Sequence, residues 1–240
     1  VLEGAEIKGV VSPYKTTRQL FTIDTISLNW GQLVGSIPSK ANLVVKMVTP
    51  TDPANPALQP LIMAGVDKLA IDLDLGAAWT ESTGAFALAP ATIDLGNLAK
   101  AQVGFALANV PRGLFTTDPV QAMGQAAQVE TGALELSLRD SGVVDLVVAQ
   151  FARMQNVSRD AARSAIVEMI RAQGEKIAGA SADAKGAVDA LAGFVETSGQ
   201  TLTVKLAPRA KVPLMQLMQL IQTDPENALA QFRIEASTGL

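Results

Sequence analysis

The chain has 240 residues, a mass of 25.0 kDa and a formal net charge of −4. It contains neither histidine nor cysteine, which excludes serine–histidine and cysteine–histidine nucleophilic catalysis, thiolate and imidazole metal sites, and disulfide bonds within the chain. The acidic balance, with a pI of about 4.9, argues against a nucleic-acid partner, because such a protein needs a basic surface to displace counterions.

Hydropathy sets two further limits. Hydrophobic residues make up 48% of the chain and charged residues 18%, which is the composition of a folded protein. Although the mean hydropathy is high at +0.26, no apolar run approaches the roughly 20 residues that span a bilayer. We therefore predict no transmembrane segment in this chain.

Alternation of apolar and polar residues dominates the first half of the chain. It predicts strands near residues 5–11, 19–30, 43–47, 69–75, 86–95 and 103–107. In the second of these the apolar phase slips by one position at Thr25-Ile26, which predicts a β-bulge. Pro90 predicts a bulge or an edge in the fifth, because proline donates no backbone hydrogen bond. A short helix is expected over residues 57–64, ending at Gly65.

The hydrophobic period changes from two to three or four after residue 138. A strand ends there, and a helical hairpin is predicted at about residues 141–178. Asp140 or Ser141 is the expected N-cap of its first helix, and Ser158 that of its second. The first apolar stripe consists of Val143, Leu146, Val147, Gln150, Phe151 and Met154, and the second of Ala162, Ala165, Ile166, Met169 and Ile170.

More helices are predicted before and after this hairpin. One covers residues 118–128, with Asp118 as its cap and Pro119 at its first position. Others cover residues 183–196 and 213–231, the last in two segments divided at Asp224-Pro225. The segment that follows Pro213 is apolar almost all round, with only a stripe of glutamines. Strands are expected near residues 202–206 and 232–236.

Strands with one apolar face, following one another along the chain, favour an antiparallel sheet. The helices interrupt this series without strict βαβ alternation, which is typical of the α+β class. We predict a curved antiparallel β-meander covered on one face by the helices at 141–178, 183–196 and 213–231. Residues 1–240 are expected to form a single domain, with 141–196 as a helical insertion or subdomain.

The sequence contains one arrangement of acidic residues that resembles a catalytic or metal site. Asp72 and Asp74 lie on the same face of a predicted strand, as in a calcium loop or a glycosidase pair. The other elements of a calcium loop are missing, and the opposite face of this strand is apolar. We interpret both carboxylates as the solvated face, and we predict no catalytic residue, no metal site and no cofactor.

An excess of apolar side chains on helices is the most unusual feature. Most such residues belong to a core, yet flexible methionines also suit irregular or variable apolar surfaces. These apolar side chains therefore predict either an ordinary core or a groove for a lipid or a partner helix. The candidate groove residues are Phe151, Met154, Met169, Phe194, Met215, Leu217 and Met218.

The alternating strands, the Arg139-Asp140-Ser141-Gly142 entry to an Ala/Arg-rich helical insertion, and the segments 206–213 and 223–225 resemble those of β-rich envelope proteins of alphaproteobacteria. Those proteins are usually longer, with an N-terminal signal and related β-rich modules. The resemblance implies an exported, periplasmic protein of which this chain is the C-terminal part. No functional residue can be assigned to this chain from the resemblance.

Two functions remain open at this point. The first is a non-enzymatic periplasmic or envelope module that binds an apolar, lipid-like ligand between its sheet and its helices. The second is a structural or protein-interaction module of the envelope, whose apolar face at residues 213–222 buries against another protein. Loss of activity on replacing Asp72 and Asp74 would be needed to support a hydrolase.

Overall fold

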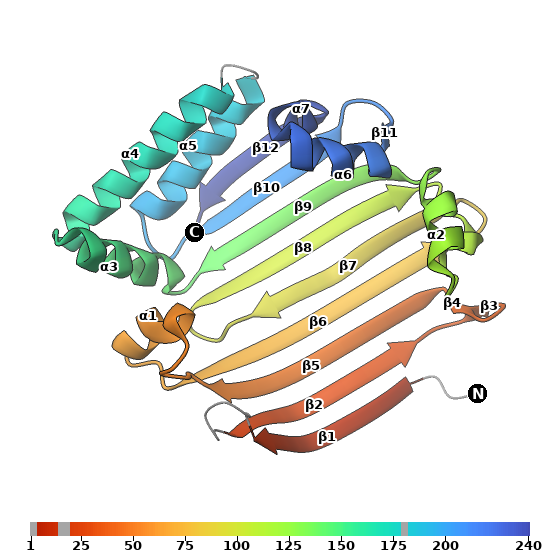
Figure 1. The fold of residues 1–240 in the computed structure, drawn as a ribbon, viewed down its shortest axis with the longest axis horizontal. Coiled ribbons are helices and arrows are strands. Elements are labelled where there is room, and N and C mark those ends of the chain that lie inside the picture. Colours follow the sequence, from red (N-terminus) through yellow and green to blue (C-terminus); the bar gives the residue numbers. More distant parts are fainter. Residues whose placement is uncertain (1–3, 14–19, 179–181) are drawn as a thin grey trace.

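The computed structural model describes residues 4–13, 20–178 and 182–240. Within them, ten strands form one open antiparallel sheet in the order β1-β2-β5-β6-β7-β8-β9-β10-β12, with β11 paired to β9 (Figure 1). A separate hairpin consists of β3 (Leu33–Val34) and β4 (Ile37–Pro38). The main strands are β1 (Gly4–Pro13), β2 (Leu20–Trp30), β5 (Lys40–Pro50), β6 (Lys68–Thr80), β7 (Ala85–Asp94), β8 (Ala99–Ala108), β9 (Glu130–Asp140), β10 (Thr201–Pro208), β11 (Val212–Pro213) and β12 (Phe232–Gly239).

Helices occur between the strands, as predicted for an α+β protein. The predicted fold class is confirmed: the sheet is antiparallel, open and ordered almost entirely as a meander. The helices are α1 (Gln59–Met63), α2 (Pro119–Ala126), α3 (Val143–Gln155), α4 (Arg159–Ala178), α5 (Ala182–Glu196), α6 (Leu214–Thr223) and α7 (Pro225–Ala230), with short 3₁₀ turns at Pro56–Leu58 and Arg112–Leu114.

The sheet is apolar on one face across its whole width. One row of paired residues runs from the first strand to the tenth: Ile7, Ile26, Val45, Leu73, Ile93, Ala101, Leu138 and Leu202. Directly paired residues of neighbouring strands lie on the same face, so these side chains form a continuous apolar band.

The opposite face is polar and carries exposed ion pairs between neighbouring strands. Lys46 pairs with Asp72, Lys100 with Asp94, and Lys205 with Glu135. The amide of Asn42 donates to the carboxylate of Asp74 at 2.7 Å. Asp72 and Asp74 therefore bond to neighbouring strands, which agrees with their interpretation as the polar face.

Irregularities in strand pairing bend the sheet, two of them at positions that the sequence singled out. The register of β2 against β5 shifts between Ile23 and Thr25, which places the predicted bulge at Asp24, one residue before the expected position. The register of β7 shifts against β6 and again against β8 around Pro90, as predicted from its missing N–H. Bulges of this kind increase the local twist of a sheet.

The helices cover the apolar face only over the C-terminal strands of the sheet, β9 to β12. The main helix-to-sheet contacts of the described residues fall on β9, β10, β11 and β12. In Figure 1, α3 to α7 gather at this end, whereas β1, β2 and β5 lie far from them. The predicted cover is therefore partial: the apolar side chains of β2 from Ile23 onward, of β5, and of β6 from Leu69 to Leu75 are only half-buried or exposed.

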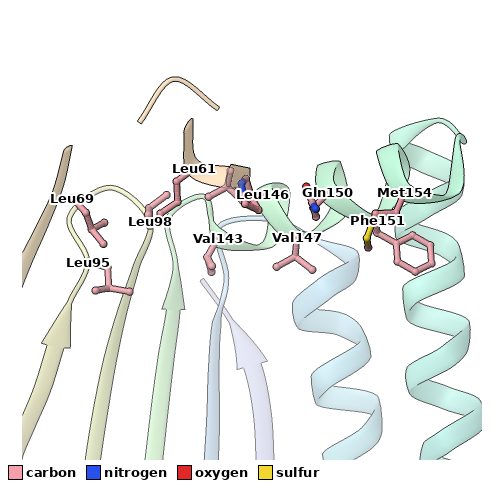
Figure 2. A pocket seen from close by; sticks show the side chains of 11 residues that line it. Leu61, Leu69, Leu95, Leu98, Val143, Leu146, Val147, Gln150, Phe151 and Met154 are labelled. Carbon is pink, nitrogen blue, oxygen red and sulfur yellow. The ribbon is translucent and has the colours of Figure 1, made fainter. Parts of the chain in front are cut away.

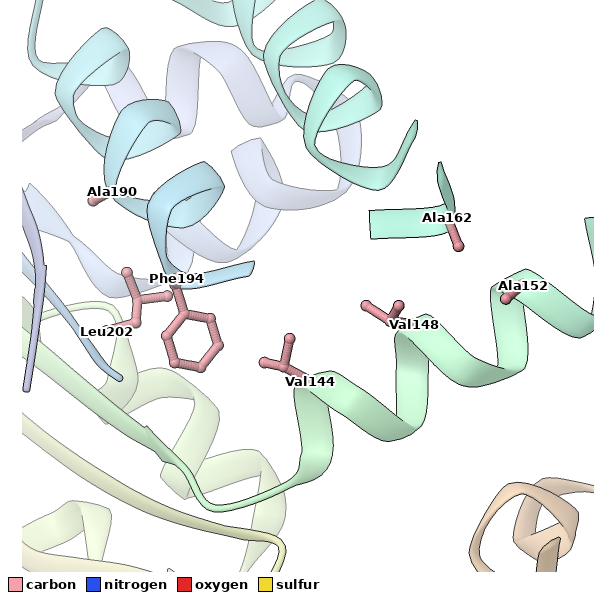
Figure 3. Close-up of a cluster of buried hydrophobic side chains, with 7 residues drawn as sticks. All are labelled: Val144, Val148, Ala152, Ala162, Ala190, Phe194 and Leu202. Carbon is pink, nitrogen blue, oxygen red and sulfur yellow. The ribbon is translucent and has the colours of Figure 1, made fainter. Parts of the chain in front are cut away.

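Two buried clusters join the helices to the same face of β10. The first contains Val144, Val148, Ala152, Ala162, Ala190, Phe194 and Leu202, and packs against Leu138 and Val204 (Figure 3). The second contains Val212, Leu217, Ala228 and Phe232, and packs against Leu206. Leu202, Val204 and Leu206 alternate along β10, so one strand face supports α5 at one end and α6 with α7 at the other.

A third cluster lies at the far end of the sheet, around Trp79. Trp79, Val110 and Val129 are its buried members. The indole N–H of Trp79 donates to the carbonyl of Val110 at 3.0 Å, and its ring meets Phe115 edge to face with centroids 4.8 Å apart. These contacts bury the end of β6 beneath the segment that precedes α2.

Close packing of α4 against α5 leads to a matched pair of mutational predictions. A Cβ added at Gly174 in α4 would overlap both methyl groups of Val188 in α5, whereas at Gly186 no atom lies within 4 Å. Alanine gains roughly 1 kcal/mol over glycine within a helix. Gly186→Ala should therefore stabilise the protein, and Gly174→Ala should destabilise it by about 1–2 kcal/mol through overpacking. Urea unfolding of both variants measures the difference, and equal effects would contradict this packing.

Candidate apolar binding site

A pocket of about 390 Å³ opens at the end of the apolar face, where α1 and α3 meet the ends of β6 and β7. Figure 2 shows its side chains arranged beneath α3 and around the β7–β8 turn. The volume lies at the lower end of the range for small-molecule sites. All but one of its lining residues are apolar: Pro60, Leu61, Leu69, Leu95, Leu98, Val143, Leu146, Val147, Phe151 and Met154, with Gln150 as the exception.

Helix α3 forms one wall of the pocket because it has two apolar faces. Val144, Val148 and Ala152 are spaced four residues apart and are buried against α4 and α5. Val143, Val147 and Met154 lie on another side and line the pocket. The predicted apolar stripe of this helix is thus the pocket wall, and the more deeply buried face is adjacent to it.

The turn that enters α3 is held by a buried carboxylate. Asp140, only 2% exposed, accepts hydrogen bonds at Oδ1 from the N–H groups of Gly142 (2.9 Å) and Val144 (3.1 Å). Its Oδ2 accepts from Gly199 at 2.8 Å, in the turn between α5 and β10. One side chain therefore holds the start of α3 and joins both ends of the α3–α5 insertion. The N-cap residue itself is Gly142 and not Asp140 or Ser141 as predicted, because the carboxylate of Asp140 reaches the first turn from two residues before it.

The same contacts set the acidity of Asp140. Burial of the carboxyl acts to raise its pKa, but hydrogen bonds from the surrounding backbone N–H groups, that of Gly199 first, outweigh burial. The pKa of Asp140 consequently lies below its ordinary value. The charged form is the one that the fold stabilises.

A second polar network fixes α3 relative to its neighbours. Arg163 of α4 donates to the carbonyl of Val195, to Asp145 of α3 and to Ser198, and the Ser198 hydroxyl donates to Asp145 at 2.7 Å. The network joins α3, α4 and the end of α5, so the pocket wall is held from behind. Local sequence patterns could not predict this network, because its members are far apart along the chain.

The structure does not bring the seven candidate groove residues together. Phe151 and Met154 line the pocket. Phe194 and Leu217 are buried in two different clusters, so in this structure they are core. Met169 on α4 and Met215 and Met218 on α6 are exposed and lie outside the pocket lining.

Five of the eleven lining residues lie outside α3, and no sequence pattern connected them to it. Leu61, Leu69, Leu95 and Leu98 come from α1, β6 and the β7–β8 turn. The alternating pattern predicted strands at Leu69 and Leu95, but it could not show that those strand ends face a helix that begins only at Val143. Only the tertiary fold brings them together.

In the described part of the chain, no helix is both long and apolar enough to cross a bilayer. Across residues 4–13, 20–178 and 182–240, no three acidic side chains gather where they could hold a metal ion.

Comparison with known proteins adds one result. The model of a protein family described as "Uncharacterized protein" matches residues 92–238, more than half of the chain. The chain belongs to this family. The matched segment contains α2 to α7 and therefore the α3 wall, Leu95 and Leu98, whereas α1 and Leu69 precede it. No curated protein matches the sequence.

Proposed function

We propose that this protein is a non-enzymatic module that binds an apolar, lipid-like ligand at the pocket between α1, α3 and the sheet. The observation that carries the proposal is the second apolar face of α3. Val147 and Met154 on that face are 56% and 64% exposed, although the helix already buries its other face in the core. A soluble surface rarely keeps such side chains together unless something covers them.

The pocket also continues into the open half of the sheet. Leu69 at its wall, and Ile71, Leu73 and Leu75 beyond it, share one face of β6. None of the last three belongs to a buried cluster of the described residues. A ligand with a long apolar part would cover surface that the protein itself leaves half-exposed.

Binding of a neutral apolar probe tests the proposal directly. Purified protein should carry co-purified lipid, detected by solvent extraction and mass spectrometry, and the delipidated protein should enhance the fluorescence of an acyl probe with a Kd in the micromolar range or below. The expected gain follows from burying roughly 300 Å² of apolar surface, about 7 kcal/mol before the cost of association. Protein that carries no lipid and does not bind the probe would contradict the proposal.

A second candidate is a protein-interaction module, favoured by the outer face of α6. Met215, Met218 and Ile221 are exposed there at a spacing of three residues, next to the buried Leu217. A partner helix or sheet would cover this strip. Because Leu217 is core, substitution at Met218 and Ile221 is the appropriate test, with assembly as the readout.

We also propose that the protein acts in the periplasm or the cell envelope. The proposal is supported by the resemblance of its strand pattern and helical insertion to envelope proteins. Fractionation of cells that express the full-length protein tests it, and recovery with cytosolic markers would contradict it.

A further inference from the structure

The inference that follows rests on the proposed binding site and concerns the polar end of its ligand. Among the described residues, Gln150 is the only polar one that lines the pocket. Its Oε1 accepts a hydrogen bond from Nη2 of Arg153 at 3.1 Å. Because a guanidinium group can only donate, Arg153 fixes the amide with its oxygen toward the arginine. The two N–H donors of Gln150 Nε2 then have no acceptor among the described residues.

Arg153 is a second donor group at this place. It is exposed in the last turn of α3, and it forms no ion pair with a carboxylate of the described residues. By contrast, Arg163 and Arg171 on the neighbouring helix are both paired with acidic side chains. The apolar pocket thus has, at one point of its rim, an amide donor and an unpaired cation. An oxygen anion complements both.

The rest of the site suits a hydrocarbon chain. From Leu69 to Trp79 the apolar face of β6 extends for ten residues, roughly 33 Å at the rise of a strand. At its far end Ala77 and Trp79, with Phe86 and Phe115, line a second apolar pocket of about 200 Å³. The residues that pair with this face, Leu43, Val45 and Met47 of β5 and Ile93 of β7, are uncharged.

We infer that the ligand is a long-chain carboxylate, of the fatty-acid class, with its carboxylate at Gln150 and Arg153 and its chain along β6. The positive charge of Arg153 matches a single negative charge, and its planar guanidinium matches a carboxylate. The small volume of the pocket favours one chain over several. Gln150 contacts the ligand, and Arg153 both orients that amide and supplies charge.

The test compares palmitate with hexadecanol, which has the same chain and no charge. Displacement of a neutral fluorescent probe gives both affinities. Charge-assisted hydrogen bonds at a partly exposed site should make palmitate about five- to tenfold tighter for the wild-type protein. Arg153→Gln should abolish this preference by weakening palmitate binding more than hexadecanol binding, because only the acid loses a charged partner. Arg233→Gln, which removes the same charge from an exposed position on β12, should keep it.

Each result has a separate meaning. Equal binding of the acid and the alcohol by the wild-type protein would overturn the inference and leave the proposed apolar site standing. Binding of neither compound would contradict the proposed function itself. Loss of preference in Arg233→Gln as well as Arg153→Gln would show that net charge, and not this site, selects the acid.

Fatty acids of different length test the path of the bound acyl chain along β6. Palmitate should bind several-fold more tightly than laurate, since its extra methylenes cover more of β6. Leu73→Glu, which puts a carboxylate on the middle of this face, should weaken palmitate more than laurate and so remove the advantage of palmitate. If Leu73→Glu weakens both acids equally, or neither, the chain does not follow β6.

Discussion

Asp140→Ala is expected to lower the free energy of unfolding by roughly 3–5 kcal/mol. The change leaves the N–H groups of Gly142, Val144 and Gly199 without their charged acceptor, at one bond that is buried (Val144) and two that are partly buried. Each buried donor without a partner costs about 1–3 kcal/mol, and the helix cap is lost as well. Urea unfolding followed by circular dichroism measures the change.

Asp118→Ala is the matched control. Asp118 also caps a helix, accepting from Val120 and Gln121, but these bonds are exposed to solvent. Its loss should cost only about 1 kcal/mol. Equal losses from the two variants would show that Asp140 acts as an ordinary cap and does not hold the insertion at both ends.

The stability of the wild-type protein should also depend on pH through Asp140. The folded-state pKa of this carboxyl is lowered, so its contribution is complete above the unfolded-state pKa of about 4 and is lost as the pH falls through the lower folded-state value. Asp140→Asn removes this proton linkage. The difference in stability between the two proteins should be constant above pH 5 and shrink below pH 4.

The second large effect is expected at the pocket. The double variant Val147→Glu, Met154→Glu should weaken binding of an acyl ligand by about a hundredfold or more. Both side chains are more than half exposed in the free protein, so two glutamates there should change stability by less than about 1 kcal/mol. A bound chain would have to remove water from two carboxylates, which costs several kcal/mol.

Met218→Glu, Ile221→Glu is the matched control for the pocket variant. These α6 residues are 51% and 56% exposed and lie outside the pocket lining, so the change adds the same charge at similar exposure. It should leave ligand binding intact and would disrupt an assembly that uses α6. If both double variants bind an acyl probe as the wild-type protein does, the pocket on α3 is not the site.

Local sequence patterns predicted most of the elements. Alternation placed the strands, and the change of period after Leu138 placed α3 and α4. Capping chemistry placed helix starts at Asp118, Ser158 and Asp224, each of which accepts from the backbone of its own helix. These signals succeed because a strand or a helix turn depends mainly on residues within four positions of one another.

The candidate site was only partly predictable. Phe151 and Met154 were recognised as apolar side chains on a helix, and they line the pocket. Phe194 and Leu217 looked the same in sequence and are core. Whether such a residue lies in the core or lines the pocket depends on which helix face meets the sheet. An apolar stripe does not show this when a helix has apolar residues on two sides.

The sequence by itself determined the α+β class, the meander of one-sided strands and the absence of histidine and cysteine chemistry. The tertiary structure decided which apolar surface is left open. Burial depends on contacts between distant segments: α5 to α7 cover β9, β10 and β12, and the face of β6 is left for the pocket beneath α3. A period of two or of 3.6 shows which side of an element is apolar, but only packing shows what covers it.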